Sequence, residues 1–512
     1  MLIKTFGCAC YGINATTITI EVDVSPGLGF CMVGLPDNAV KESQQRISTA
    51  LQSLKYRMPG RKVVINMAPA DIRKEGSAYD LSLAVGILAA SEQIKATNIE
   101  HYVIMGELSL DGLIRPITGA LPIAIQARSE NFKGFILPKE NAREAAVVNN
   151  LDVYGVETLQ EVIDFFNEKK TLSPTIVNTR EEFAQQGISY DVDFADVKGQ
   201  ENVKRALEIA AAGGHNIIMI GPPGSGKTML AKRIPTIIPP LTLNEALETT
   251  KIHSVAGKID KNTGLISRRP FRAPHHTVSN VGLVGGGTHP QPGEISLAHN
   301  GVLFLDELPE FQRTVLEVIR QPLEDRQITV SRAKYSIEYP ANFMLVASMN
   351  PCPCGYYNHP EKKCVCAPGM VQKYLGKISG PLLDRIDIHI EVVPVPFSQL
   401  SETRMAESSA EIRQRVISAR QLQAQRFANE SGVHNNAMMS SRLLKKYCII
   451  DTRCNAILKN AMERLGLSAR AYDRILKVSR TIADLEKEEQ IMPDHVAEAI
   501  QYRSLDREGW AG

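Results

Sequence analysis

Long hydrophobic runs are absent from this 512-residue sequence, in which no uncharged apolar stretch reaches membrane-spanning length. We therefore expect no transmembrane helix and no membrane partner. The amino terminus also lacks the basic stretch and the continuous apolar core of a secretory signal. For that reason we expect the chain to remain in the cytoplasm.

An excess of charge of one sign is missing as well, because 58 lysines and arginines face 56 acidic residues and leave a formal net charge of +2. This balance neither demands nor excludes a nucleic-acid partner, since a motor needs only a local basic channel. Nine cysteines in so long a chain do not make a disulfide framework. The remaining composition, 44% hydrophobic and 22% charged, is typical of a globular protein with roughly two to four domains.

The pattern along the chain divides it into four parts and predicts a multidomain α/β fold. Residues 1–168 mix strand-like and helix-like stretches, which predicts an α+β domain. Residues 169–193 are polar, contain Pro174 and read as a linker. In residues 194–394 short apolar strands alternate with helices, as in a parallel sheet covered on both faces. Residues 395–512 are helical almost throughout and predict a lid.

The boundaries of several strands and helices can be predicted from the sequence. We expect a strand over residues 62–67 and a helix over residues 78–90. In the predicted lid, helical periodicity runs through residues 401–431, 440–465, 469–487 and 493–503.

A phosphate-binding loop is the strongest motif. It follows the apolar run 217–220 and consists of Gly221, Pro222, Pro223, Gly224, Ser225, Gly226, Lys227 and Thr228. Glycines let backbone N–H groups turn toward phosphates, the lysine supplies positive charge, and the threonine hydroxyl can ligate Mg²⁺. The spacing therefore predicts an ATP and Mg²⁺ site, and the strand before the motif argues against a simple glycine-rich turn.

Two carboxylates and an amide extend this site. The apolar strand 302–305 ends in Asp306 and Glu307, as a Walker B segment does. We expect Asp306 to hold Mg²⁺ and Glu307 to orient the attacking water. The alternative, an exposed acidic strand end, is disfavoured by the phosphate loop that precedes it. A further strand over 343–348 leads to Asn350, whose amide can position the same water as sensor 1.

Two arginines are candidates for contacts between subunits or domains. Arg385 lies in the segment 380–387 and is a candidate arginine finger, which requires a ring or filament of subunits. Arg470 is a candidate sensor 2 that couples nucleotide state to the lid, with Arg474 in reserve. For either lid arginine, a solvated helix charge is the alternative.

The sequence segments between these motifs resemble one protein family more specifically. Residues 269–277, 285–287 and 292–300 resemble the YifB/ComM family of magnesium-chelatase-like AAA+ ATPases, and the similarity covers essentially the whole chain. The resemblance implies a hexameric ring that hydrolyses ATP and acts as a DNA helicase, promoting branch migration during natural transformation.

Two other functions are open to a chain of this kind. One is an ATPase of the magnesium-chelatase or MoxR type that remodels a protein partner, although no integrin-type partner domain is evident. The other is an ATP-dependent protease, because the amino-terminal domain resembles the Lon proteolytic fold. In that alignment Ala78 stands at the nucleophile, with Ser77 adjacent, and Leu121 stands at the general-base lysine. Without nucleophile and base, peptide hydrolysis has no route.

Two basic stretches are candidate DNA contacts. Alternation over residues 326–339 predicts a hairpin that resembles the pre-sensor-1 hairpin of MCM helicases, with Arg332 and Lys334 as phosphate contacts. The second stretch contains Arg268, Arg269 and Arg272. Phe271, which lies within it, could stack on a base. For both stretches, a solvated loop or a subunit contact is the alternative.

A cysteine cluster follows sensor 1. Cys352 and Cys354 are separated by nine residues from Cys364 and Cys366, so four thiolates could ligate one tetrahedral Zn²⁺. His359 could replace one ligand. The alternative is four reduced thiols in a mobile loop.

Overall fold

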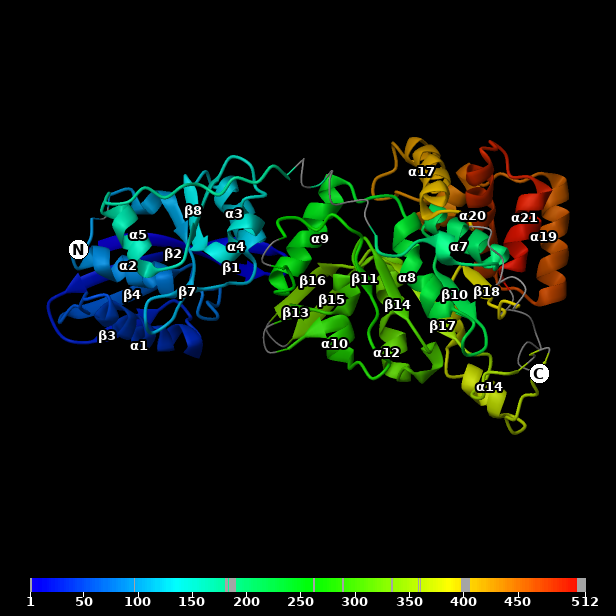
Figure 1. Ribbon diagram of the computed structural model, residues 1–512, viewed down its shortest axis with the longest axis horizontal. Helices are drawn as coiled ribbons and strands as arrows, with labels where there is room; N and C mark the ends of the chain where they lie inside the picture. Colours follow the sequence, from blue (N-terminus) through cyan, green and yellow to red (C-terminus); the bar gives the residue numbers. More distant parts are fainter. Residues whose placement is uncertain are drawn as a thin grey trace.

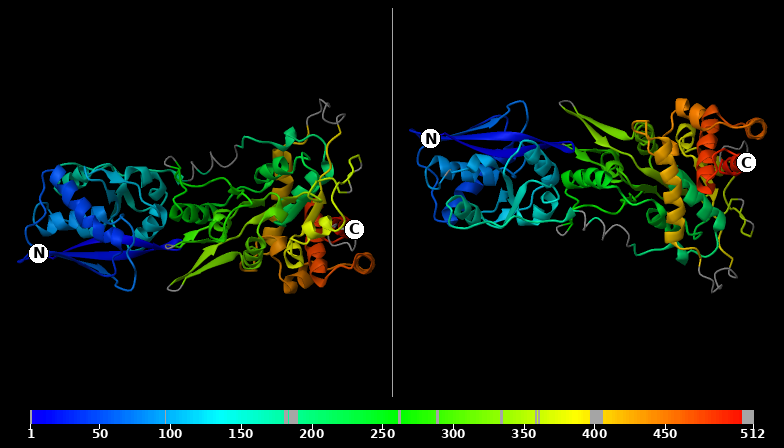
Figure 2. Two further views of the ribbon diagram at one scale, coloured as in Figure 1. Left: turned by 90° about the horizontal axis from the view of Figure 1, so that it is seen from below. Right: turned by 90° about the horizontal axis from the view of Figure 1, so that it is seen from above.

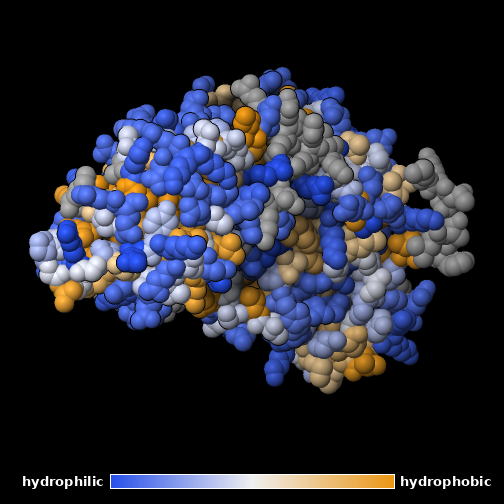
Figure 3. Space-filling view, turned by 60° about the vertical axis from the view of Figure 1, so that its left-hand side comes forward, coloured by the Kyte–Doolittle hydropathy of each residue, from blue (hydrophilic) through white to orange (hydrophobic). Residues whose placement is uncertain are grey.

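The computed structural model describes residues 2–503 apart from 96, 180–182, 184–189, 261–262, 288–289, 333–334, 358, 360 and 397–405. The molecule is elongated, with an amino-terminal α/β domain at one end, a parallel sheet in the middle and a helical region at the other end (Figure 1). The predicted fold class is therefore confirmed. Within the described ranges, no helix combines the length and apolar character that a membrane crossing requires. The face shown in Figure 3 is mainly hydrophilic, with apolar residues in separate patches.

The amino-terminal domain is built on a seven-stranded mixed sheet in the order β3-β4-β2-β1-β5-β8-β9. Its strands are β1 (Leu2–Tyr11), β2 (Asn14–Ser25), β3 (Phe30–Val33), β4 (Lys62–Ala68), β5 (Tyr102–Ile104), β8 (Gly134–Pro138) and β9 (Asp152–Val156). Alternate residues of β2 are buried, as expected of a strand with one face on a core. The strand predicted over 62–67 is β4.

Helices of this domain pack against the sheet. They are α1 (Asn38–Ser53), α2 (Asp80–Ala90), α3 (Ala120–Ser129), α4 (Lys139–Ala145) and α5 (Leu159–Phe166). The helix predicted over 78–90 is α2, which is buried along its whole length because it lies in the middle of the domain core. The short strands β6 (Glu107–Leu108) and β7 (Ile114–Arg115) form a separate ribbon.

The central sheet has five parallel strands in the order β11-β14-β17-β10-β18. They are β10 (Ile217–Ile220), β11 (Phe271–Arg272), β14 (Val302–Leu305), β17 (Met344–Met349) and β18 (Ile388–Glu391). Successive residues of β10 enter different cores: Ile217 and Met219 on one face, Ile218 and Ile220 on the other. A strand buried on both faces needs a continuous apolar run, which explains why these strands could be recognised in the sequence.

Helices and two antiparallel strand pairs surround this sheet. The helices are α7 (Glu201–Gly213), α8 (Lys227–Ile237), α9 (Leu243–Val255), α10 (Asn280–Val284), α11 (Glu294–Leu297), α12 (Arg313–Val318), α13 (Arg320–Asp325), α14 (Met370–Leu375) and α15 (Gly380–Leu383). Strands β12 (Gly285–Gly286) and β13 (Gln291–Pro292) form one ribbon, and β15 (Gln327–Arg332) pairs antiparallel with β16 (Tyr335–Pro340). The second pair confirms the predicted hairpin.

The carboxy-terminal region consists of α17 (Ser409–Arg426), α18 (Ser441–Tyr447), α19 (Thr452–Leu465), α20 (Ala469–Glu486) and α21 (Pro493–Gln501). The periodicity over 440–465 suggested one helix, and this was wrong. Asp451 accepts a hydrogen bond from the Cys454 N–H and so caps a new helix, α19. Part of the helix predicted over 401–431 lies outside the described residues.

The amino-terminal domain and the central region share a packed junction. Helix α9 packs on α3, and Leu241, Ala246 and Leu265 of the central region belong to the apolar core of the amino-terminal domain. The turn between β1 and β2 reaches the β15–β16 hairpin, where the Tyr11 hydroxyl donates to the Ser336 carbonyl at 3.3 Å. Figure 2 shows the tip of the β1–β2 arm reaching the central region beside the hairpin. The amino-terminal domain and the central region are therefore in direct contact, in addition to being linked by the chain.

Candidate nucleotide-binding site

The phosphate loop connects β10 to the amino terminus of α8. Two of its residues, Gly224 (φ +80°) and Gly226 (φ +92°), occupy the left-handed region, which a side chain with a Cβ rarely adopts. This backbone and the helix amino terminus behind it favour an anion.

Lys227 and Asn350 meet at this loop. The Lys227 ammonium donates to the carbonyls of Gly221 (2.7 Å) and Pro222 (3.0 Å) and to the Asn350 side-chain oxygen (3.2 Å). Burial lowers the pKa of Lys227, an effect opposed by the carboxylates of Asp306 and Glu307. Asn350, at the end of β17, is therefore beside the lysine although it lies far away in the sequence.

Thr228 and Asp306 also lie side by side. The Thr228 hydroxyl donates to one Asp306 carboxylate oxygen at 2.7 Å, and Ser348 donates to the other. The Glu307 N–H reaches the second oxygen at 3.1 Å. A hydroxyl and a carboxylate at this spacing are the hard oxygen donors that Mg²⁺ prefers, so these residues fit that ion.

Ser348 was not identified from the sequence. In the sequence it is only a hydroxyl residue near the end of an otherwise apolar strand. The parallel register of β17 with β14 brings it next to Asp306.

Glu307 projects from a residue in the left-handed conformation (φ +53°), and its side chain is 55% exposed. His276 approaches it, with 3.6 Å between the imidazole Nδ1 and the carboxylate Oε2. The His276 ring also lies against His275 and edge-on to Phe311. His276 was likewise not singled out as a site residue, because its contact depends on β11 and β14 being neighbours in the sheet.

The two candidate subunit or lid arginines differ in exposure. The Arg385 side chain is 9% exposed and pairs within the chain with Glu324 (2.6 Å). It also donates to the Pro381 carbonyl. Arg470 is 61% exposed and lies 3.5 Å from Asp384. None of the described contacts joins either arginine to the phosphate loop of its own chain. Their predicted roles depend on another subunit or another lid position.

The reserve arginine, Arg474, has a different partner. It forms an ion pair with Asp387 at 3.0 Å, and Asp387 also contacts the His215 Nδ1 at 3.1 Å. This buried cluster connects α20 to the start of β18.

Among the predicted DNA contacts, Arg269 is surrounded by partners from its own chain. Its guanidinium donates to the carbonyls of Pro239 and Asn300 and lies near Glu245, and burial lowers its pKa. These partners hold the Arg269 guanidinium within the protein.

The other predicted DNA contacts have different surroundings. Arg272 is paired with Glu294 through two hydrogen bonds of 2.6 and 2.7 Å. Arg268 is exposed and lies over the Tyr190 ring. Phe271 stacks on Phe304 rather than projecting freely. Lys334 and the side chain of Arg332 lie outside the described residues.

The four cysteines of the predicted zinc loop converge. Their sulfur atoms all lie within 4.8 Å of one another. Three of the pairs are Cys352–Cys354 at 3.3 Å, Cys354–Cys364 at 3.5 Å and Cys352–Cys364 at 3.7 Å. His359 takes no part in this cluster, since its Nδ1 accepts backbone N–H groups of Glu361 and Lys362. The four thiols together are a donor set that could hold a metal ion.

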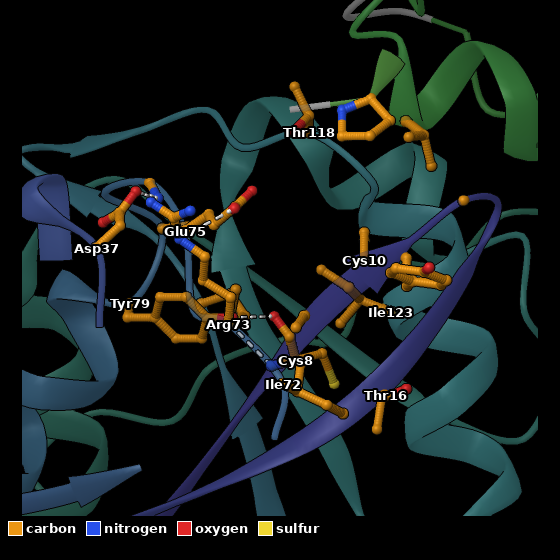
Figure 4. Close-up of a pocket in the computed structure, with 18 of the residues that line it drawn as sticks. Cys8, Cys10, Thr16, Asp37, Ile72, Arg73, Glu75, Tyr79, Thr118 and Ile123 are labelled. Carbon is orange, nitrogen blue, oxygen red and sulfur yellow. Dashed lines mark hydrogen bonds and ion pairs between the residues drawn. The ribbon is translucent and has the colours of Figure 1, made fainter. Parts of the chain in front are cut away.

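A cavity of about 700 Å³ lies at the junction between the amino-terminal domain and the central region. Figure 4 shows Asp37, Glu75, Tyr79 and Thr118 around it. Ala78 lines this cavity, whereas Ser77 donates to Glu107.

Leu121 occupies the position of the Lon general base. Leu121 is buried there, and its side chain carries no basic group. The alignment with Lon thus places apolar side chains at both chemically essential positions.

Comparison with known proteins places these observations in a family. Three protein-family models match the chain. The family described as "Magnesium chelatase, subunit ChlI" matches residues 193–400, "Subunit ChlI of Mg-chelatase" matches residues 20–141, and "Magnesium chelatase, subunit ChlI C-terminal" matches residues 406–503. Lon protease 2 of Bacillus subtilis is 33% identical over 159 residues, which are 28% of this chain and 27% of the protease.

Two relatives match along nearly the whole chain. The competence protein ComM of Haemophilus influenzae is 44% identical over 501 residues, covering 98% of this chain and 97% of the relative. YifB of Escherichia coli is 44% identical over 506 residues, covering 98% and 96%. The chain therefore belongs to the YifB/ComM family of magnesium-chelatase-like AAA+ proteins.

Proposed function

We propose that this chain is a ring-forming ATPase that uses ATP hydrolysis to move DNA. The observation that carries the proposal is the convergence of Lys227 with Asn350 and of Thr228 with Asp306 at the carboxyl ends of adjacent strands. Ligands bind at this edge in parallel α/β sheets.

In this proposal each residue has a separate task. The backbone of the phosphate loop and Lys227 hold the phosphates, while Thr228 and Asp306 hold Mg²⁺. When bound, Mg²⁺ neutralises charge on the phosphate oxygens. Glu307 polarises the attacking water and Asn350 helps to position it. The 55% exposure of Glu307 leaves its carboxylate accessible to that water.

The proposed assembly is a hexamer in which Arg385 of one subunit reaches the nucleotide of its neighbour. Arg385 then has to leave Glu324, so the intrachain pair is the resting position of a finger that engages on assembly. Arg470, near the start of α20, is the proposed lid arginine. Arg474, the alternative candidate, forms an ion pair with Asp387.

The proposed DNA path uses two basic segments of the central region. The β15–β16 hairpin, with Arg332 and Lys334, and the segment with Arg268 and Arg272 provide phosphate contacts that do not read bases. Arg269 is left out because of its protein partners. One relative is named a competence protein, and this name supports a role in DNA uptake or recombination for this chain too.

The cofactors of the proposal are ATP and Mg²⁺. The amino-terminal domain is proposed to act as a scaffold without peptide hydrolysis, since Ala78 and Leu121 supply neither nucleophile nor base.

Steady-state ATP hydrolysis tests the proposal when it is measured without polymer, with single-stranded DNA, with forked DNA and with unfolded casein. We expect DNA to stimulate turnover and casein to leave it unchanged. An Arg268→Ala variant should weaken the stimulation and its salt dependence, whereas Lys459→Ala on the exposed face of α19 should not. Stimulation by casein alone would instead favour an ATPase that remodels a protein partner.

A further inference from the structure

The cysteine loop has the dimensions of a loaded metal site. Zinc–thiolate bonds of about 2.3 Å in a tetrahedron place the sulfurs about 3.8 Å apart. The sulfur separations of 3.3, 3.5 and 3.7 Å are close to that value and far longer than the roughly 2.0 Å of a disulfide. All four cysteines are free thiols.

Backbone donors around the sulfurs suit thiolates. The Tyr357 N–H points at the Cys352 sulfur at 3.3 Å, and the N–H groups of Tyr356 and Val365 hydrogen-bond Cys354. Such donors stabilise the negative charge that four thiolates leave around a divalent ion. Lys362, over the ring of Tyr356, adds positive charge beside the loop.

The same loop is packed against the nucleotide site. Cys352 is fully buried and follows Asn350 by two residues. Gly355, at φ +84°, lies so near Pro223 of the phosphate loop that an added Cβ would come within 2.4 Å of the proline ring. A cavity of about 80 Å³ lies between these parts and is lined by Pro222, Gly355 and Val392 among others.

We propose that Cys352, Cys354, Cys364 and Cys366 bind one Zn²⁺ and that this ion clamps the phosphate loop in its nucleotide-binding shape. The clamp has two contacts: the covalent link from Cys352 to Asn350, and the packing of Gly355 on Pro223. Four soft thiolates select Zn²⁺ over Mg²⁺, so the two metals of the protein occupy different sites. The clamp rests on the proposed function, whereas the metal site itself does not.

Metal content tests the site independently of ATP hydrolysis. The full-length protein, purified without chelators, should contain about one zinc per chain. Cys364→Ser should lose the metal, and Cys31→Ser, which changes an exposed cysteine of β3, should keep it. Replacement by Co²⁺ should give the visible absorption of a tetrahedral thiolate site. Protein without zinc that gains no such absorption, or protein that contains iron instead, overturns the zinc assignment.

Nucleotide affinity tests the clamp. Removal of zinc from the wild-type protein should weaken binding of a fluorescent ATP analogue by roughly 5- to 150-fold, the usual range of coupling between two sites. Gly355→Ala should weaken binding while it retains zinc, because the new methyl group meets Pro223 rather than a sulfur. Circular dichroism should show that the zinc-free wild type and the Gly355→Ala variant both remain folded.

Each outcome separates the metal site from the clamp and the clamp from the ATPase. If zinc removal and Gly355→Ala leave the affinity unchanged, the clamp is wrong even though the metal site stands. If the zinc-loaded wild type binds no ATP at all, the proposed ATPase fails, and the clamp fails with it.

Discussion

Replacing Asp387 by Asn should loosen the attachment of α20 to the central sheet. The Asp387 carboxylate is 1% exposed and contacts Arg474 at 3.0 Å and His215 at 3.1 Å, so it joins α20 to the start of β18. Loss of one partner of a buried ion pair costs about 3–5 kcal/mol. Because Arg474 is 21% exposed and can be partly rehydrated, we expect the lower end, about 3 kcal/mol.

This free energy corresponds to about a hundredfold change in an opening equilibrium. Amide hydrogen exchange followed by mass spectrometry should show it as faster exchange in α20 (Ala469–Glu486). Arg470→Gln is the matched control on the same helix, because its exposed pair with Asp384 contributes about 0.5 kcal/mol or less. Equal exchange rates in the two variants would refute the idea that Asp387 anchors α20.

Three further predictions concern pH, water activation and the protease-like domain. Burial lowers the pKa of His215, so the unfolded chain binds a proton at a higher pH than the folded chain does. The melting temperature should therefore fall as the pH drops below about 6.5. A melting temperature that does not change between pH 7 and 5 would contradict this. His276→Ala should lower kcat for ATP about two- to fivefold with KM nearly constant, whereas His101→Ala, an exposed change in the other domain, should not; equal rates would remove His276 from the site. Wild-type protein should not degrade casein, and degradation that Ser77→Ala abolishes would reinstate the protease.

Much of the fold and the nucleotide motifs could be predicted because they depend on local sequence. The parallel strands are buried on both faces, so they appear as short apolar runs such as 217–220. The phosphate loop needs glycine where φ is positive, as at Gly224 and Gly226. The hairpin was visible in its alternation, which matches the antiparallel register of β15 and β16.

Contacts between distant segments could not be predicted in this way. The Arg269 guanidinium donates to the carbonyl groups of Pro239 and Asn300, and Arg385 pairs with Glu324. Nothing in a basic stretch distinguishes an arginine that faces solvent from one that ties loops together. Ser348 and His276 were missed for the same reason, since sheet order alone brings them to Asp306 and Glu307.

The most direct test of the account compares Mg²⁺-dependent binding and hydrolysis of ATP in the wild type with those in Glu307→Gln. The amide keeps the size of the side chain but does not polarise water, so binding should be retained while turnover falls about 10²- to 10⁴-fold. A wild type that fails to bind ATP with Mg²⁺ present, or a variant that hydrolyses it at the wild-type rate, would contradict the central claim that these residues form an ATPase site.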